Sequence, residues 1–175
     1  MGTGKSQLVA ELAKESKSHR EVVDHDFQPY CYIYDKSLDH LSLEQKKGFA
    51  SLRTQNPAYP ANFTAAALEH LNAGRIVLSP FIEHVFDAYN APYFKNQTKD
   101  VRKIIVMPHK DNFAEYEQRY LDRKNNAEFI ERRRAEFPRM VELFETAADD
   151  YEKIIPAPNQ VLAEILRDVL PDVLT

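Results

Sequence analysis

Short apolar segments alternate with helical patterns along this 175-residue chain. The apolar segments cover residues 21–26, 75–80, 103–107 and 151–156, and each ends in, or is directly followed by, polar residues or proline. Strands that are separated by helices pair in parallel when the helices cross over the sheet. The unbroken apolar runs in 76–78 and 104–107 are typical of strands that are buried on both faces. We therefore expect an α/β fold with three layers, α/β/α, around a parallel sheet.

Helical spacing of apolar residues and local stop signals place helices between these strands. The expected helices cover residues 7–18, 42–52, 63–73, 82–93, 113–121, 127–148 and 160–170. Asn62 and Asn112 stand where N-terminal caps are expected, and Gly74 stands where one helix should end. Residues 27–41 and 54–61 contain prolines without a clear period, so we expect irregular structure there.

Composition bounds the class of protein. The chain is 43% hydrophobic with a formal net charge of -4, which is typical of a globular domain and gives no broad basic surface for nucleic acid. Its only cysteine, Cys31, excludes an intramolecular disulfide and suits a reducing compartment. No apolar run is long enough to span a bilayer. We expect a single cytoplasmic domain, 1–175, without a membrane or nucleic-acid partner.

The first six residues read Met-Gly-Thr-Gly-Lys-Ser and match the second half of the pattern G-x-x-x-x-G-K-[S/T]. In that pattern the backbone N–H groups of the loop surround phosphate oxygens, the lysine reaches the outer phosphates and the serine hydroxyl ligates Mg²⁺. The helix that follows presents its positive end to the same phosphates. The residues expected to bind a nucleotide are Gly2, Thr3, Gly4, Lys5, Ser6 and Gln7.

The other half of this pattern is not in the sequence. Its first glycine, and the buried strand that normally leads into the loop, would precede Met1. We therefore expect a parallel sheet whose first strand is missing, in a chain that is either a fragment or begins at an internal start codon.

Polar residues follow the predicted strands. Asp24 and Asp26 end the first strand, Ser79 follows the second and His109 follows the third. Ligands of open parallel sheets bind outside the carboxyl ends of the strands, so these residues mark the expected site. Asp24 is a candidate Mg²⁺ ligand with Ser6, and Asp26 is a candidate base towards an acceptor hydroxyl. Both carboxylates could instead end the strand and cap a turn.

The C-terminal half resembles guanylate kinases. The matching residues are Ile104–Pro108, Tyr116–Arg119, Arg123, Ile130, Arg132, Arg133 and Asp150–Ile155. The resemblance implies that Arg119, Arg123 and either Arg132 or Arg133 hold ATP phosphates in a lid near 119–134. The lid match is partial, because Asn125 and Asn126 occupy the places of a threonine and an aspartate.

The N-terminal half is similar to a different group, the shikimate- and gluconate-type kinases. Asp24-His25-Asp26 matches their D-x-D, and residues 67–78 match their helix, glycine and strand. This implies that one aspartate helps to hold Mg²⁺ and the other contacts the acceptor. Together, the two resemblances identify the chain as a member of the P-loop small-molecule and nucleotide kinases.

The resulting hypothesis is a kinase that transfers a phosphoryl group from ATP with Mg²⁺. Lys5, Asp26, Arg119, Arg123 and Arg132 are the expected catalytic residues. A nucleoside monophosphate is the favoured acceptor, and a hydroxyl-bearing small molecule is the alternative. Two further substrate-binding candidates are Asp24 and Arg53, the latter in an acceptor-binding insertion around 27–61; a guanidinium suits phosphate or carboxylate.

Ordinary structural interpretations remain open for several residues. Arg53 could be a solvated charge, and the arginines of 132–139 could pair with glutamates on the same helix. The aromatic stretch 30–34 fits a pocket for a planar acceptor or ordinary packing. A non-kinase P-loop nucleotide-binding module, inactive through truncation, is a further alternative, although it should carry an acidic residue where Ser79 stands.

Overall fold

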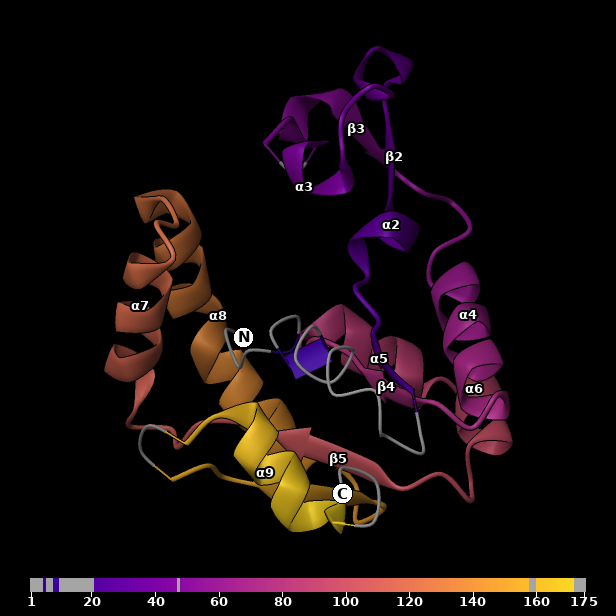
Figure 1. Cartoon of the computed structure of the whole chain (residues 1–175), viewed down its shortest axis with the longest axis vertical. Coiled ribbons are helices and arrows are strands. Elements are labelled where there is room, and N and C mark those ends of the chain that lie inside the picture. The colour runs from indigo at the N-terminus through magenta and orange to yellow at the C-terminus, as the bar shows by residue number, and fades with distance from the viewer. Residues whose placement is uncertain (1–4, 6–7, 10–20, 47, 158–159, 172–175) are drawn as a thin grey trace.

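A computed structural model describes residues 5, 8–9, 21–46, 48–157 and 160–171 of the chain. Its strands and helices form a mixed α/β fold, as the sequence predicts (Figure 1). The described strands form three two-stranded sheets. Strands β1 (Val22–Asp24) and β4 (Ile76–Leu78) pair in parallel, as do β5 (Lys103–Val106) and β6 (Tyr151–Ile154). The expected parallel pairing is thus confirmed, but within the described residues the strands do not join into one sheet.

Each parallel ladder continues beyond its last strand residue. The backbone N–H of His25 donates to the carbonyl of Leu78 at 2.8 Å, and that of Met107 donates to Ile154 at 3.1 Å. The extended backbone of β1 therefore continues to His25, and that of β5 continues to Met107.

One apolar cluster connects the carboxyl ends of the two parallel pairs. It consists of Leu8 together with Leu162, Ala163 and Leu166 of helix α9 (Leu162–Val169). Leu78, the last residue of β4, and Val106, the last residue of β5, both pack against this cluster. The two parallel pairs therefore end next to the same patch of apolar side chains.

The main core lies between the strands and three helices, α4 (Ala61–Asn72), α5 (Glu83–Asn90) and α8 (Ala127–Thr146). The helix α8 contributes residues at helical spacing: Phe137, Met140, Leu143 and Phe144. The core also contains Phe63 of α4, which is completely buried, and Met107 after β5. The short helix α6 (Pro92–Gln97) packs beside α4 through Phe94.

Two arms extend from this body (Figure 1). The insertion arm contains α2 (Gln28–Cys31), β2 (Tyr32–Tyr34), the 3-10 turns 36–38 and 50–52, α3 (Leu43–Lys46) and β3 (Arg53–Gln55). Strands β2 and β3 pair antiparallel. The helical arm consists of α7 (Phe113–Asp122) and the first half of α8. In Figure 1 the two arms stand apart and rise on the same side of β5.

Some predicted boundaries were wrong. Asn62 lies inside α4 instead of capping it, and its side-chain amide donates to the carbonyl of Tyr30 at 3.1 Å. Residues 53–55 form β3, although irregular structure was expected from residue 54 onwards. The expected helix 82–93 is two helices, because Pro92 begins α6 at a position where its missing N–H costs nothing. The expected helix 42–52 is α3 followed by a 3-10 turn.

None of the described helices combines the length and the apolar character that crossing a bilayer requires.

Candidate functional site

The side chain of Lys5 meets that of Asp24 at the carboxyl end of β1. Lys5 Nζ lies 2.6 Å from Asp24 Oδ1, and the two side chains are 18% and 20% exposed. Lys5 has helical backbone, and Asp24 is the last residue of its strand. The structure therefore brings together a lysine and an aspartate that the sequence placed, independently, in a phosphate-binding loop and at a strand end.

Asp26 follows at the same edge and caps the next turn. Its Oδ1 accepts a hydrogen bond from the backbone N–H of Gln28 at 3.3 Å, at the start of α2. This is the turn-capping interaction that the sequence left open as an alternative role for Asp26.

The other loop residues expected to bind a nucleotide or Mg²⁺, namely Gly2, Thr3, Gly4, Ser6 and Gln7, lie outside the described residues. Among the described residues, no group of three or more His, Cys, Asp and Glu side chains is arranged to hold a metal ion. Mg²⁺ commonly takes only one or two carboxylates together with phosphate oxygens and water. The hard oxygen donors Asp24 and Asp26 suit such a site.

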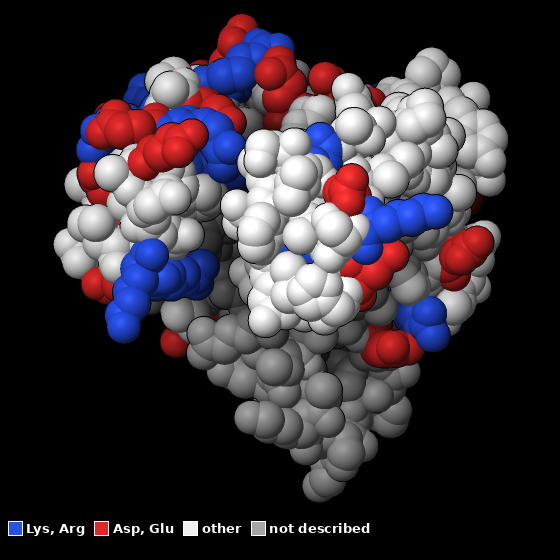
Figure 2. Space-filling model, turned by 90° about the horizontal axis from the view of Figure 1, so that it is seen from above, with Lys and Arg blue, Asp and Glu red and all other residues white. Residues whose placement is uncertain are grey.

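The predicted arginines lie on the helical arm. Arg119 pairs with Glu115 one turn earlier on α7 and stacks 5.0 Å from the ring centroid of Tyr116. Arg123 follows the last residue of α7 and is exposed. Figure 2, a view from above, shows mixed acidic and basic side chains over this arm and a largely uncharged surface across a narrow hollow.

Of the two arginines that the sequence left open on α8, Arg132 is exposed and Arg133 is half-buried. Arg133 bonds to Glu136 at 2.6 Å, and its guanidinium lies 5.0 Å from the ring of Phe129. Although His84 on α5 is exposed, desolvation by its neighbours lowers its pKa; Glu136 acts to raise this pKa, and Arg133 acts to lower it. Arg133 lies on a helix that shares the main core with α5.

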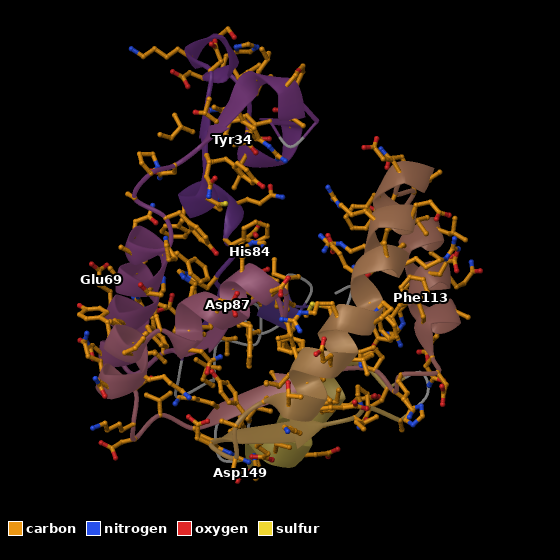
Figure 3. The ribbon with its side chains drawn as sticks, turned by 180° about the vertical axis from the view of Figure 1, so that it is seen from behind. Tyr34, Glu69, His84, Asp87, Phe113 and Asp149 are labelled. Atoms are coloured by element: carbon orange, nitrogen blue, oxygen red, sulfur yellow. The ribbon has the colours of Figure 1, made fainter. Side chains whose placement is uncertain are left out.

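Sequence reasoning missed the contribution of His84. Its ring lies edge-on to the rings of Phe27 and Tyr59, with ring centroids 4.7 Å and 6.0 Å apart. The hydroxyl of Tyr59 donates to the backbone carbonyl of His84 at 3.2 Å. Figure 3 shows His84 at the end of α5 that lies beneath α2, with Asp87 on the same helix. The contacts of His84 with Phe27 and Tyr59 join the body to the base of the insertion arm. No local sequence pattern predicts them.

Arg53 lies on the insertion arm and is not brought into contact with Lys5. It begins β3, and its guanidinium stacks 3.9 Å from the ring centroid of Tyr32 on the paired strand β2. Stacking holds a guanidinium flat while leaving its edge available for an anion. Its distance from Lys5 follows from the position of β3 in the outer part of the arm (Figure 1).

Ser79 follows β4, at one of the strand ends where the sequence placed the expected site. Its hydroxyl lies 2.5 Å from the hydroxyl of Tyr89 on α5. Burial raises the pKa of Tyr89 well above its usual value, so both groups are neutral hydroxyls and one donates to the other. Ser79 is therefore hydrogen-bonded to a helix that packs on the main core.

Comparisons with protein-family models, with curated proteins and with solved structures found no match to this chain.

Proposed function

We propose that this protein is an ATP-dependent phosphotransferase that transfers the γ-phosphoryl group to a small acceptor, with a nucleoside monophosphate favoured. The observation that carries the proposal is the ion pair between Lys5 Nζ and Asp24 Oδ1, 2.6 Å apart, at the carboxyl end of a parallel strand pair. Ligands of parallel sheets bind at that end, and the G-K-S motif supplies a lysine for phosphate there.

The ion pair gives Lys5 a defined position before a nucleotide binds. In phosphoryl transfer the protein mainly positions the reactants and neutralises the negative charge that spreads over the transferred group. Lys5 supplies one positive charge, and Asp24 holds it near the strand end. Mg²⁺, when bound with ATP, adds further positive charge at the phosphate oxygens.

Arginines on the helical arm support the proposal, because they can supply positive charge to a bound phosphate. Arg119 and Arg133 each pair with a glutamate that lies about one turn away on the same helix. Partly exposed pairs of this kind are weak, so a phosphate group can replace the glutamate as the partner. We infer that the acceptor enters from the insertion arm, where Arg53 stacks on Tyr32.

We also propose that the fold is a three-layer P-loop fold with a further strand between β4 and β5. Leu78 and Val106 pack against one cluster, so the two strand pairs end side by side. In the described part of the chain, neither β4 nor β5 has a second neighbouring strand. All three residues of β4 are only partly buried, although its apolar sequence is typical of a strand covered on both faces.

Isothermal titration with Mg·ATP and Mg·ADP tests the activity, using this chain, Lys5→Ala and the matched control Lys103→Ala. Lys103 also forms an ion pair with an aspartate, Asp150 at 2.9 Å, but at the opposite end of a parallel strand. We expect binding by the unmodified chain and by Lys103→Ala, and its loss in Lys5→Ala. Equal binding by all three proteins, or by none, would contradict the proposal.

An acceptor screen that measures ADP release follows from a positive titration. Nucleoside monophosphates are compared with hydroxyl-bearing acids, which were the alternative acceptors. Phosphorylation of a nucleoside monophosphate that weakens in Arg53→Ala supports the favoured acceptor. Phosphorylation of a hydroxyl acid alone would replace it with the alternative.

A further inference from the structure

Three polar side chains are buried in the described part of the chain, His25, Thr64 and Thr98. The two threonine hydroxyls each donate to a carbonyl three or four residues earlier in the chain, which satisfies them locally. His25 instead reaches across the fold, since its Nε2 lies 3.1 Å from the backbone carbonyl oxygen of Phe63 on α4. Of these three residues, His25 is the one that links two distant elements.

Aromatic contacts fix the ring of His25 on several sides. The ring stacks on Phe63 with centroids 4.4 Å apart, lies 5.1 Å from Tyr30 of α2, and meets His70 of α4 edge-on at 5.7 Å. Only 2% of the residue is exposed. A carbonyl oxygen can only accept, so this contact assigns the proton to Nε2 and makes the ring a donor.

The direction of the His25 side chain constrains its neighbour Asp24. The backbone N–H of His25 extends the β1–β4 ladder by donating to Leu78. Successive side chains of an extended chain point to opposite faces. With His25 directed towards α4, Asp24, which precedes it as the last residue of the strand, is directed to the other face. The carboxylate of Asp24 indeed meets Lys5, and not α4.

We propose that His25 is a positioning residue, whose hydrogen bond to the Phe63 carbonyl and stacked ring hold the carboxylates of Asp24 and Asp26 at the phosphate-binding end of β1. The inference rests on the proposed function for its catalytic consequence. Without the anchor, the backbone after β1 can rotate, which carries the Asp24 carboxylate away from Lys5 and the Asp26 carboxylate away from the turn that it caps. Displacements of about 1 Å in a reacting site can cost about a hundredfold in rate.

Three substitutions separate positioning from simple stability. His25→Phe keeps an aromatic ring on Phe63 but removes the donor, and His25→Gln keeps a side-chain N–H but removes the ring. Thr64→Val is the matched control, because it removes a buried hydroxyl from α4 beside Phe63. All three proteins are expected to unfold at lower temperature than the unmodified chain.

Steady-state kinetics are expected to distinguish the His25 variants from the control. Because the carboxylates orient the groups that act in the transition state and Asp24 also takes part in Mg·ATP binding, His25→Phe should lower kcat about tenfold and raise the KM for ATP. His25→Gln should recover part of this loss, and Thr64→Val should keep the unmodified kcat. An unchanged kcat in His25→Phe, or an equal loss in Thr64→Val, would overturn the proposal.

A measurement without nucleotide keeps this inference separate from the proposed function. Carbon-detected NMR of the Asp24 carboxyl, assigned with Asp24→Asn, reports whether the pair with Lys5 persists. We expect the Asp24 resonance to move in His25→Phe and to stay in Thr64→Val. If no variant binds ATP but this difference is seen, the proposed function fails and the positioning role stands. An Asp24 resonance that is identical in the unmodified chain, His25→Phe and Thr64→Val would contradict the positioning role.

Discussion

The two parallel strand pairs are alike at their amino ends and differ at their carboxyl ends. Arg75 bonds to Glu21 at 2.7 Å where β1 and β4 begin, and Arg102 bonds to Glu152 at 2.7 Å beside the start of β5 and β6. At the other end, β1 is followed by a histidine between carboxylates, whereas β5 is followed by buried Met107. The two strand pairs thus have similar ion pairs at their amino ends, but polar side chains follow β1 whereas a core side chain follows β5.

The largest expected effect is a loss of stability on substitution of a core residue beneath each strand pair. Phe63→Ala removes a completely buried ring that stacks on His25, and Met107→Ala removes a side chain that is 1% exposed at the end of β5. Substitutions of this kind cost about 2–5 kcal/mol of unfolding free energy. Denaturant unfolding should show comparable losses for both variants. A loss below about 1 kcal/mol in either would mean that its half of the core is loosely packed.

Next in size is the role of the strand-end carboxylate. Asp24→Asn should weaken Mg·ATP binding by about tenfold, because it removes one charged partner of Lys5 and one hard oxygen donor. Asp150→Asn, in the pair with Lys103 near the start of β5, should leave binding unchanged. Titration calorimetry of the two variants measures the difference. Equal effects would remove the distinction between the carboxyl ends and the amino ends.

The third prediction concerns how the unfolding free energy depends on pH. Burial lowers the pKa of His25 below its ordinary value of 6.5, despite the opposing effects of Phe63, Asp26 and Asp24. Below pH 6.5 the unfolded chain therefore binds a proton that the folded chain resists, and the unfolding free energy falls as the pH falls towards the folded pKa. Chemical denaturation in chelator at several pH values should show this slope. It should be shallower in His25→Phe, and an unchanged slope would assign the effect to another group, such as His84.

The smallest expected effects belong to the matching ion pairs at the amino ends. Arg75→Ala and Arg102→Ala each remove a partly exposed guanidinium, and such pairs contribute at most about 1 kcal/mol. Thermal unfolding at low and high salt should show small, similar and salt-dependent losses. A much larger loss for one variant would break the equivalence of the two pairs.

The sequence predicted the strands best where their signal is local. The apolar run that forms β4 stands out against its polar flanks, so its existence and its parallel pairing followed from the pattern. Strand β3 has the sequence Arg-Thr-Gln and carries no such signal. It forms because β2 lies beside it, and that pairing is a long-range contact that a local pattern cannot contain.

The candidate site was predictable to a similar degree. Asp24 and Lys5 could be placed at one edge because both follow from rules about parallel strands and phosphate loops. The anchoring of His25 could not, since it depends on where α4 packs, although strand alternation places its side chain opposite that of Asp24. The difference in exposure between Arg132 and Arg133 likewise depends on how α8 packs in the fold.

Helix α8 belongs both to the core and to the helical arm. Phe137, Met140 and Leu143 are embedded in the core, while Arg133 stands one turn before them, where the arm begins. Because these apolar residues are fixed in the core, their packing sets the direction in which the outer turns of α8 leave the body.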